Sequence, residues 1–190
     1  MGGLVSRWFI EQEGGNKVVD HLVMCGTPNA GSPFGKISGA RKISSVLTTL
    51  GINAFPVFAP FGGALLYALN RSKMLTGCLE QMNPDSEFVK TLNASDDPGV
   101  RYTVVAGDTR EYMKQSDQLA ARLIAKLARG FLFDKLYDAA AHDIAVSVDS
   151  IRAVPANRQP PPAKRTITGH HLNYFVNAES LKTLAALDWQ

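Results

Sequence analysis

The chain has 190 residues, enough for one domain of ordinary size or two small ones. Hydrophobic residues make up 45% and charged residues 19%, which excludes global disorder, and a net charge of +3 is too weak for a nucleic-acid-binding surface. Two cysteines, Cys25 and Cys78, exclude a disulfide scaffold, and the histidine spacing predicts neither a metal nor another cofactor. Arg7 and Glu11 argue against a signal peptide, so we expect a cytoplasmic protein.

Helical and extended patterns alternate along the chain. An amphipathic helix is predicted over 1–13, with an apolar stripe made of Leu4, Val5, Trp8, Phe9 and Gln12. Further helices are predicted over 116–137 and 179–187, the last with Leu181, Leu184 and Leu187 facing inward. Apolar runs predict strands at 18–24, 100–106 and 165–168. Strands that alternate with helices, without hairpin turns, predict an α/β chain with a mostly parallel sheet.

The stretch from 43 to 70 contains no charged residue. Its densest part, 52–69, has the length of a membrane span, but prolines and glycines interrupt it, and a broken helix in lipid leaves backbone groups unpaired. We therefore expect helices and loops of an apolar cap, inserted over 36–98, with peripheral lipid contact through 52–69. The alternative is that the uncharged stretch belongs to the ordinary core of the domain. Arg158, Lys164 and Arg165 are expected to form a solvated loop face.

Two residues that follow predicted strands suggest acid–base chemistry. In open α/β sheets the chemistry lies at the carboxyl ends of the strands. Asp143 and His171 are placed there in the order of the acid and the histidine of a hydrolase triad. Asp149 is the alternative acid and His170 the alternative histidine. Ser32 and Ser147 lie outside any G-x-S-x-G pattern, which disfavours them as nucleophiles.

Four segments resemble parts of the α/β-hydrolase superfamily, in particular serine hydrolases of the lipase/esterase type. Residues 1–7 (MGGLVSR) resemble the residues directly after the nucleophile in the lipase elbow G-H-S-M-G-G-L-V-x-R. Residues 26–32 (GTPNAGS) resemble the T-P-x-x-G-S loop of that family, and 142–146 (HDIAV) resemble its N-D-G-x-V acid segment. Residues 171–175 (HLNYF) resemble the segment that carries the triad histidine.

The resemblance implies that 1–190 is a single, partial domain: the C-terminal part of a doubly wound, mostly parallel α/β-hydrolase sheet with a helical apolar cap. Asp143 and His171 would then be catalytic, and the backbone N–H of Met1 would be an oxyanion donor. The serine would directly precede Met1, in a front half supplied in cis or by a partner chain; whether Met1 is the true start stays open. The implied substrate is an ester of an apolar acyl group. The alternative is a non-catalytic α/β module that binds a partner or regulates one.

Overall fold

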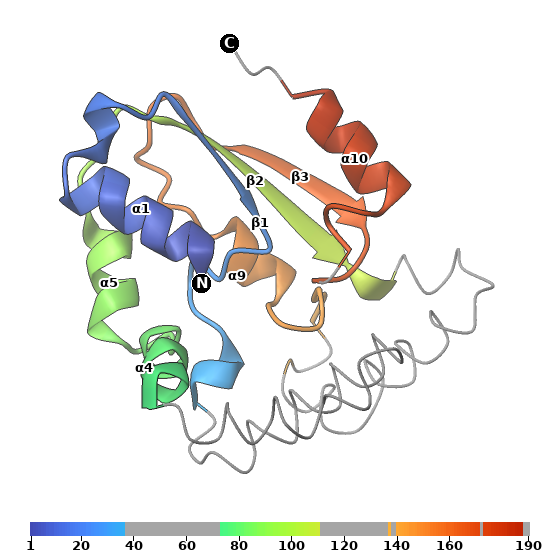
Figure 1. Cartoon of the computed structure of the whole chain (residues 1–190), viewed down its shortest axis with the longest axis horizontal. Coiled ribbons are helices and arrows are strands. Elements are labelled where there is room, and N and C mark those ends of the chain that lie inside the picture. Colours follow the sequence, from blue (N-terminus) through green and yellow to red (C-terminus); the bar gives the residue numbers. More distant parts are fainter. Residues whose placement is uncertain (37–72, 111–136, 138–139, 172, 188–190) are drawn as a thin grey trace.

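The computed structural model describes residues 1–36, 73–110, 137, 140–171 and 173–187. Within these ranges three parallel strands form one sheet in the order β1 (His21–Cys25), β2 (Arg101–Asp108) and β3 (Ala163–Thr168) (Figure 1). Every residue of β2 from Tyr102 to Asp108 is buried, as expected for a strand with both faces and both edges covered. The prediction of an α/β chain with a parallel sheet is confirmed.

The strand ends differ slightly from the predicted ones. β1 begins at His21 instead of residue 18, because the chain first makes a 3-10 turn, η1 (Gly15–Lys17), and leaves Val18 75% exposed. β2 extends to Asp108, and β3 already begins at Ala163. The register pairs Cys25 with Val105 and Asp108 with Thr168, so the strands end in a staggered row.

The two faces of the sheet pack against different helices. On one face, α1 (Gly2–Gln12) and α9 (Val148–Arg152) contribute Ile10 and Ile151 to a core cluster with Tyr102 and Val104 of β2. On the other face, Leu184 of α10 (Ala178–Ala185) packs against Val105 and Ile167. Alternate β2 residues thus enter opposite clusters, as the period of a strand requires. The other helices of the described ranges are η2 (Pro33–Lys36), α4 (Lys73–Gln81) and α5 (Glu87–Ala94).

Two predicted apolar faces are wrong in detail. In α1 the buried side chains are Leu4, Arg7 and Ile10, whereas Val5 and Phe9 of the predicted stripe are 56% and 46% exposed. In α10, Leu181 is 47% exposed, because the helix touches the core mainly through Leu184. The α1 helix is rotated relative to the prediction because it turns charged side chains toward the protein interior.

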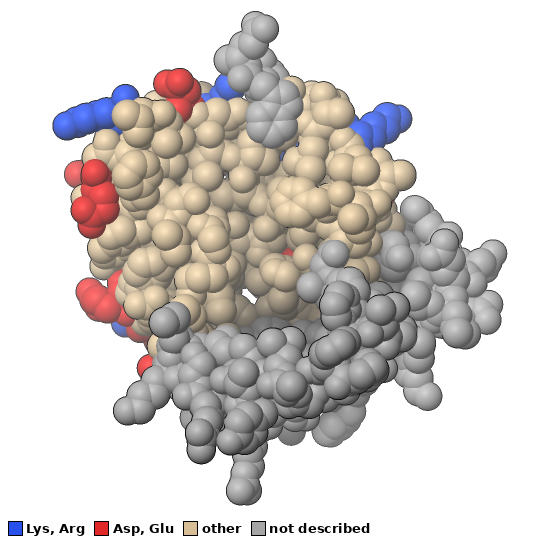
Figure 2. Space-filling view, viewed as in Figure 1, with Lys and Arg blue, Asp and Glu red and all other residues tan. Residues whose placement is uncertain are grey.

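A buried ionic cluster, formed by Arg7, Glu11 and Arg158, explains this rotation. All three side chains are fully buried. By contrast, most of the charged side chains that Figure 2 shows lie near the margin of the described surface. Glu11 Oε1 accepts hydrogen bonds from Arg7 Nε at 2.8 Å and from Tyr102 Oη at 2.9 Å. Glu11 Oε2 accepts from Arg158 Nη2 at 2.7 Å and from Ser95 Oγ. A buried carboxylate with this many donors is compensated for the loss of water.

The prediction that Arg158 lies on a solvated face is therefore wrong, while Lys164 and Arg165 are exposed as predicted. Arg158 also donates through Nη1 to the carbonyl oxygens of Ser95 and Asp96, at 2.8 and 2.7 Å. These carbonyls follow α5, and α5 stacks Phe88 on Trp8 of α1. The arginine thus joins the segment before β3 to the end of α5.

Several predictions lie outside the described residues: the helix at 116–137 except Tyr137, and the whole uncharged stretch 43–70 with its lipid-contact segment 52–69. The cap over 36–98 stays a prediction, since only its parts up to 36 and from 73 onward are described. In the parts of the chain that the structure describes, no helix is long and apolar enough to cross a membrane.

The ionic cluster gives a first prediction. Glu11→Gln keeps the shape of the side chain but leaves Arg7 and Arg158 buried without an anionic partner, and we expect it to lower the free energy of unfolding by about 3–5 kcal/mol. Urea unfolding followed by circular dichroism measures this loss. The matched control is Glu13→Gln, because Glu13 is exposed and such a change alters stability by only about 0.5 kcal/mol. Equal losses in the two variants would contradict the proposed importance of the cluster.

Candidate active site

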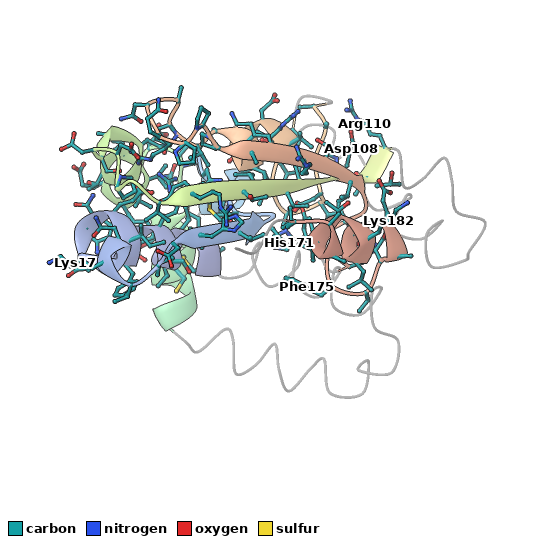
Figure 3. The ribbon with its side chains drawn as sticks, turned by 90° about the horizontal axis from the view of Figure 1, so that it is seen from above. Lys17, Asp108, Arg110, His171, Phe175 and Lys182 are labelled. Atoms are coloured by element: carbon teal, nitrogen blue, oxygen red, sulfur yellow. The ribbon has the colours of Figure 1, made fainter. Side chains whose placement is uncertain are left out.

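The loops that follow the three strands meet at one edge of the sheet. Gly26 follows β1, Thr109 follows β2, and Gly169 follows β3. Figure 3 shows His171 and Asp108 toward this edge, and Lys17 at the opposite end of the molecule. Carboxyl ends of parallel strands are where open α/β sheets place their functional groups.

Asp143 and His171 are in direct contact at this edge. Their side chains are joined by a 2.7 Å hydrogen bond between His171 Nδ1 and Asp143 Oδ2. The carboxylate is fully buried and the imidazole is 36% exposed. The backbones are joined too, because His171 N–H donates to the Asp143 carbonyl at 2.8 Å. One nitrogen of a half-exposed imidazole is thus fixed by a buried anion.

Backbone N–H groups hold the second carboxylate oxygen. Asp143 Oδ1 accepts from Ala145 N at 3.0 Å and from Val146 N at 2.8 Å. Asp143 N–H in turn donates to the Val146 carbonyl at 2.9 Å. These bonds close a tight turn, which fixes the carboxylate independently of the histidine.

The residue after the acid has a strained backbone. Ile144 has φ of 88°, in the left-handed region that a β-branched residue rarely adopts. Its N–H donates to His142 Nδ1 at 3.1 Å, and its carbonyl accepts from Tyr137 Oη at 2.9 Å. The His142 carbonyl accepts from Thr109 Oγ1 at 2.8 Å, which ties the turn to the end of β2. Strain that is maintained by so many contacts is typical of functional sites.

Gly26 gives the pair its space. It has φ of 62°, and a Cβ atom there would lie 2.8 Å from Asp143 Oδ2 and 3.0 Å from His171 Nδ1. Any side chain at this position would push the two residues apart. The glycine that opens the T-P-N-A-G-S loop is therefore required both by its backbone conformation and by the pair beside it.

The rest of that loop is structural. Asn29 is fully buried, accepts from Arg7 Nη1 at 3.1 Å and donates to the Ile151 carbonyl at 2.7 Å. Ser32 Oγ donates to the Ala145 carbonyl at 2.9 Å, which connects the loop to the turn that carries the acid. Ser147 caps α9 by accepting from Ser150 N. The two serines considered as nucleophiles thus hold the backbone in place.

The alternative acid and histidine are placed differently. Asp149 is exposed in the first turn of α9, away from the hydrogen bonds of His171. His170 is only 7% exposed, and its backbone N–H donates to Asn173 Oδ1 at 2.7 Å. Burial lowers the pKa of His170 to about 4; the adjacent His171 adds to this effect and Asp143 opposes it. A neutral, buried His170 is poorly placed for proton transfer.

Sequence reasoning missed Tyr174, which completes the surroundings of the acid. Its hydroxyl donates to Asp143 Oδ2 at 2.9 Å and accepts from Gly107 N at 2.7 Å. The ring is buried and meets the His171 ring edge-on, with centroids 6.2 Å apart. The signal for this tyrosine is its place in the 171–175 segment, three residues after the histidine.

The start of α1 lies beside the same edge. Gly3 is so close to Thr27 that a Cβ atom would overlap the threonine side chain, and Thr27 follows Gly26 in the loop. Met1 is the N-cap residue of α1. In the described part of the chain, no hydroxyl or thiol group is hydrogen-bonded to Nε2 of His171. Burial raises the pKa of the Cys25 thiol to about 11, which disfavours a thiolate there.

Within the same ranges, no group of three or more His, Cys, Asp or Glu side chains is arranged to hold a metal ion. The candidate site consists of a buried carboxylate that orients an accessible imidazole.

Comparison with protein-family models places the chain in a family. Residues 1–188 match the Domain of unknown function (DUF7379), and the chain belongs to this family. No curated protein and no solved structure matched the sequence.

The role of Gly26 gives a second prediction. Gly26→Ala forces a side chain into the left-handed region, at about 1–2 kcal/mol, and adds a clash that we expect to cost a further ~1–3 kcal/mol. Gly99→Ala is the matched control, because Gly99 has φ of 71° and nothing within 4 Å of its would-be Cβ atom. The difference between the two variants in urea unfolding measures the clash. Equal destabilisation would show that Gly26 is needed only for its backbone conformation.

A third prediction concerns acid sensitivity. The pKa of His170 is about 4 in the folded chain and 6.5 as its ordinary value, so the unfolded chain binds more protons between these limits. Stability is therefore expected to fall as the pH drops from about 6.5 toward 4. His170→Gln cannot titrate, so the loss in urea midpoint between about pH 7 and pH 5 should be smaller in this variant. The same loss in both proteins would exclude His170 as its source.

Proposed function

We propose that this member of the DUF7379 family carries the acid and the histidine of a serine hydrolase that cleaves carboxylic esters of apolar acyl groups. The observation that supports this most is the 2.7 Å contact between the buried Asp143 carboxylate and the half-exposed His171 imidazole, at the carboxyl edge of a parallel sheet. The strained turn at Ile144 and the space left by Gly26 support it further.

In this proposal the His171 imidazole transfers the proton, and Asp143 holds this imidazole in its orientation. With Nδ1 bound to Asp143, Nε2 takes the proton of the attacking serine and later returns it to the leaving alcohol. The buried carboxylate stabilises the imidazolium that forms in between. The serine lies on a segment preceding Met1, in cis or on a partner chain, and the Met1 N–H donates to the oxyanion. The position of the first turn of α1 beside Thr27 supports this arrangement.

An apolar acyl group fits the surface next to the histidine. Phe175 and Val176 follow Tyr174 and are 70% and 76% exposed. The segment directly after the candidate site therefore presents apolar side chains at the surface. Figure 3 shows Phe175 at the same end of the molecule as His171. We further propose a cytoplasmic location, where both cysteines, which are free, would stay reduced.

The test is hydrolysis of a short p-nitrophenyl ester by the chain expressed together with the coding region upstream of Met1. His171→Ala should reduce the rate on the order of 10⁶-fold, and Asp143→Asn about 10⁴-fold. Asp149→Asn, which changes an exposed acid nearby, should leave the rate unchanged. Residues 1–190 alone should not exceed background. Ester hydrolysis by the extended protein that survives His171→Ala would refute the proposal.

A non-catalytic partner-binding module is the second candidate. It is favoured by the exposed Val5 and Phe9 on α1 and by the position of β1 at one edge of the sheet in the described part of the chain. A chain with this role would stay monodisperse at 20.6 kDa and would show no esterase activity even with its upstream region. The mass measured by light scattering, together with the ester assay, separates the two candidates.

A further inference from the structure

We propose that Tyr174 is a positioning residue of the candidate site, which sets how strongly Asp143 holds His171. The tyrosine hydroxyl and His171 Nδ1 both bind Asp143 Oδ2, at 2.9 and 2.7 Å. Two donors on one oxygen share its electron density, so each weakens the bond of the other. The hydroxyl thereby limits the strength of the bond between acid and histidine.

The tyrosine is fixed in this role by β2. Gly107 N–H donates to the hydroxyl oxygen at 2.7 Å, and donation to a hydroxyl strengthens the hydrogen bond that the hydroxyl itself gives. A Cβ atom at Gly107 would lie 3.0 Å from the hydroxyl and 3.3 Å from Asp143 Cβ, so only glycine leaves this approach unhindered. Burial, and then the charge of Asp143, raises the pKa of Tyr174, which keeps the hydroxyl protonated and able to donate.

Tyr174 also joins three elements of the fold. Gly107 belongs to β2, Asp143 to the turn before α9, and His171 to the loop after β3. Tyr174 contacts all three, two through its hydroxyl and His171 through its ring. The catalytic meaning of this inference rests on the proposed hydrolase, but the bonds can be measured whether or not the chain hydrolyses esters.

The test is proton and nitrogen NMR of the imidazole groups in the 190-residue chain. In Tyr174→Phe, Oδ2 has one donor fewer, so the Nδ1–H resonance of His171 should move downfield. The matched control is Tyr102→Phe, which removes an equally buried hydroxyl that donates to the Glu11 carboxylate at 2.9 Å, away from the site. Tyr102→Phe should leave the His171 resonances in place. A resonance that is unchanged or moves upfield in Tyr174→Phe overturns the inference.

A second variant covers the case in which Tyr174→Phe does not fold. Placing 3-fluorotyrosine at position 174 makes the hydroxyl a stronger donor without removing it, and the same resonance should then move upfield. A downfield or absent shift overturns the inference. Loss of ester cleavage plays no part in these readouts, so failure of the hydrolase proposal and failure of this one are distinguishable.

Discussion

The Glu11 carboxylate is the constraint on which the arrangement of this chain depends. It receives hydrogen bonds from α1, from β2 and from two segments that flank the sheet, all away from water. Arg7 of this cluster also donates to Asn29 Oδ1, in the loop after β1, and to the carbonyl oxygen of Leu92. Asn29 in turn donates to the carbonyl oxygen of Ile151, near the end of α9. A charge buried under one helix thus helps to fix the loop that opens with Gly26.

At the candidate site, the segment after each strand makes a different contribution to the contact between Asp143 and His171. The loop after β1 supplies space, because it has no side chain at Gly26. The end of β2 holds the turn of the acid through Thr109, and the loop after β3 brings the histidine. The strained Ile144 is tolerated because all of these contacts define its position. The geometry therefore belongs to the assembled sheet edge and to no single segment.

The sequence predicted the parallel sheet well, since an apolar run such as 100–106 suits only a strand covered on both faces. It also paired Asp143 with His171, which the fold brings into contact. The predicted strand before Asp143 is wrong in the described residues, because Asp143 lies in a turn before α9 with only an isolated bridge beside it. It failed at Arg7 and Arg158, because long charged residues are almost always exposed and only the three-dimensional pairing with Glu11 makes them interior. The positive φ of Ile144 could not be predicted from the sequence either, because no local pattern indicates such a backbone for a β-branched residue.

The hydrogen bonds to the Asp143 carboxylate also limit its contact with water. A carboxylate offers about four lone-pair positions, and here two backbone N–H groups, the imidazole and the phenol hydroxyl occupy them. No acceptor position is left for a solvent molecule to be activated by the acid itself. Of the two side chains, only the His171 imidazole, which is 36% exposed, is therefore open to solvent.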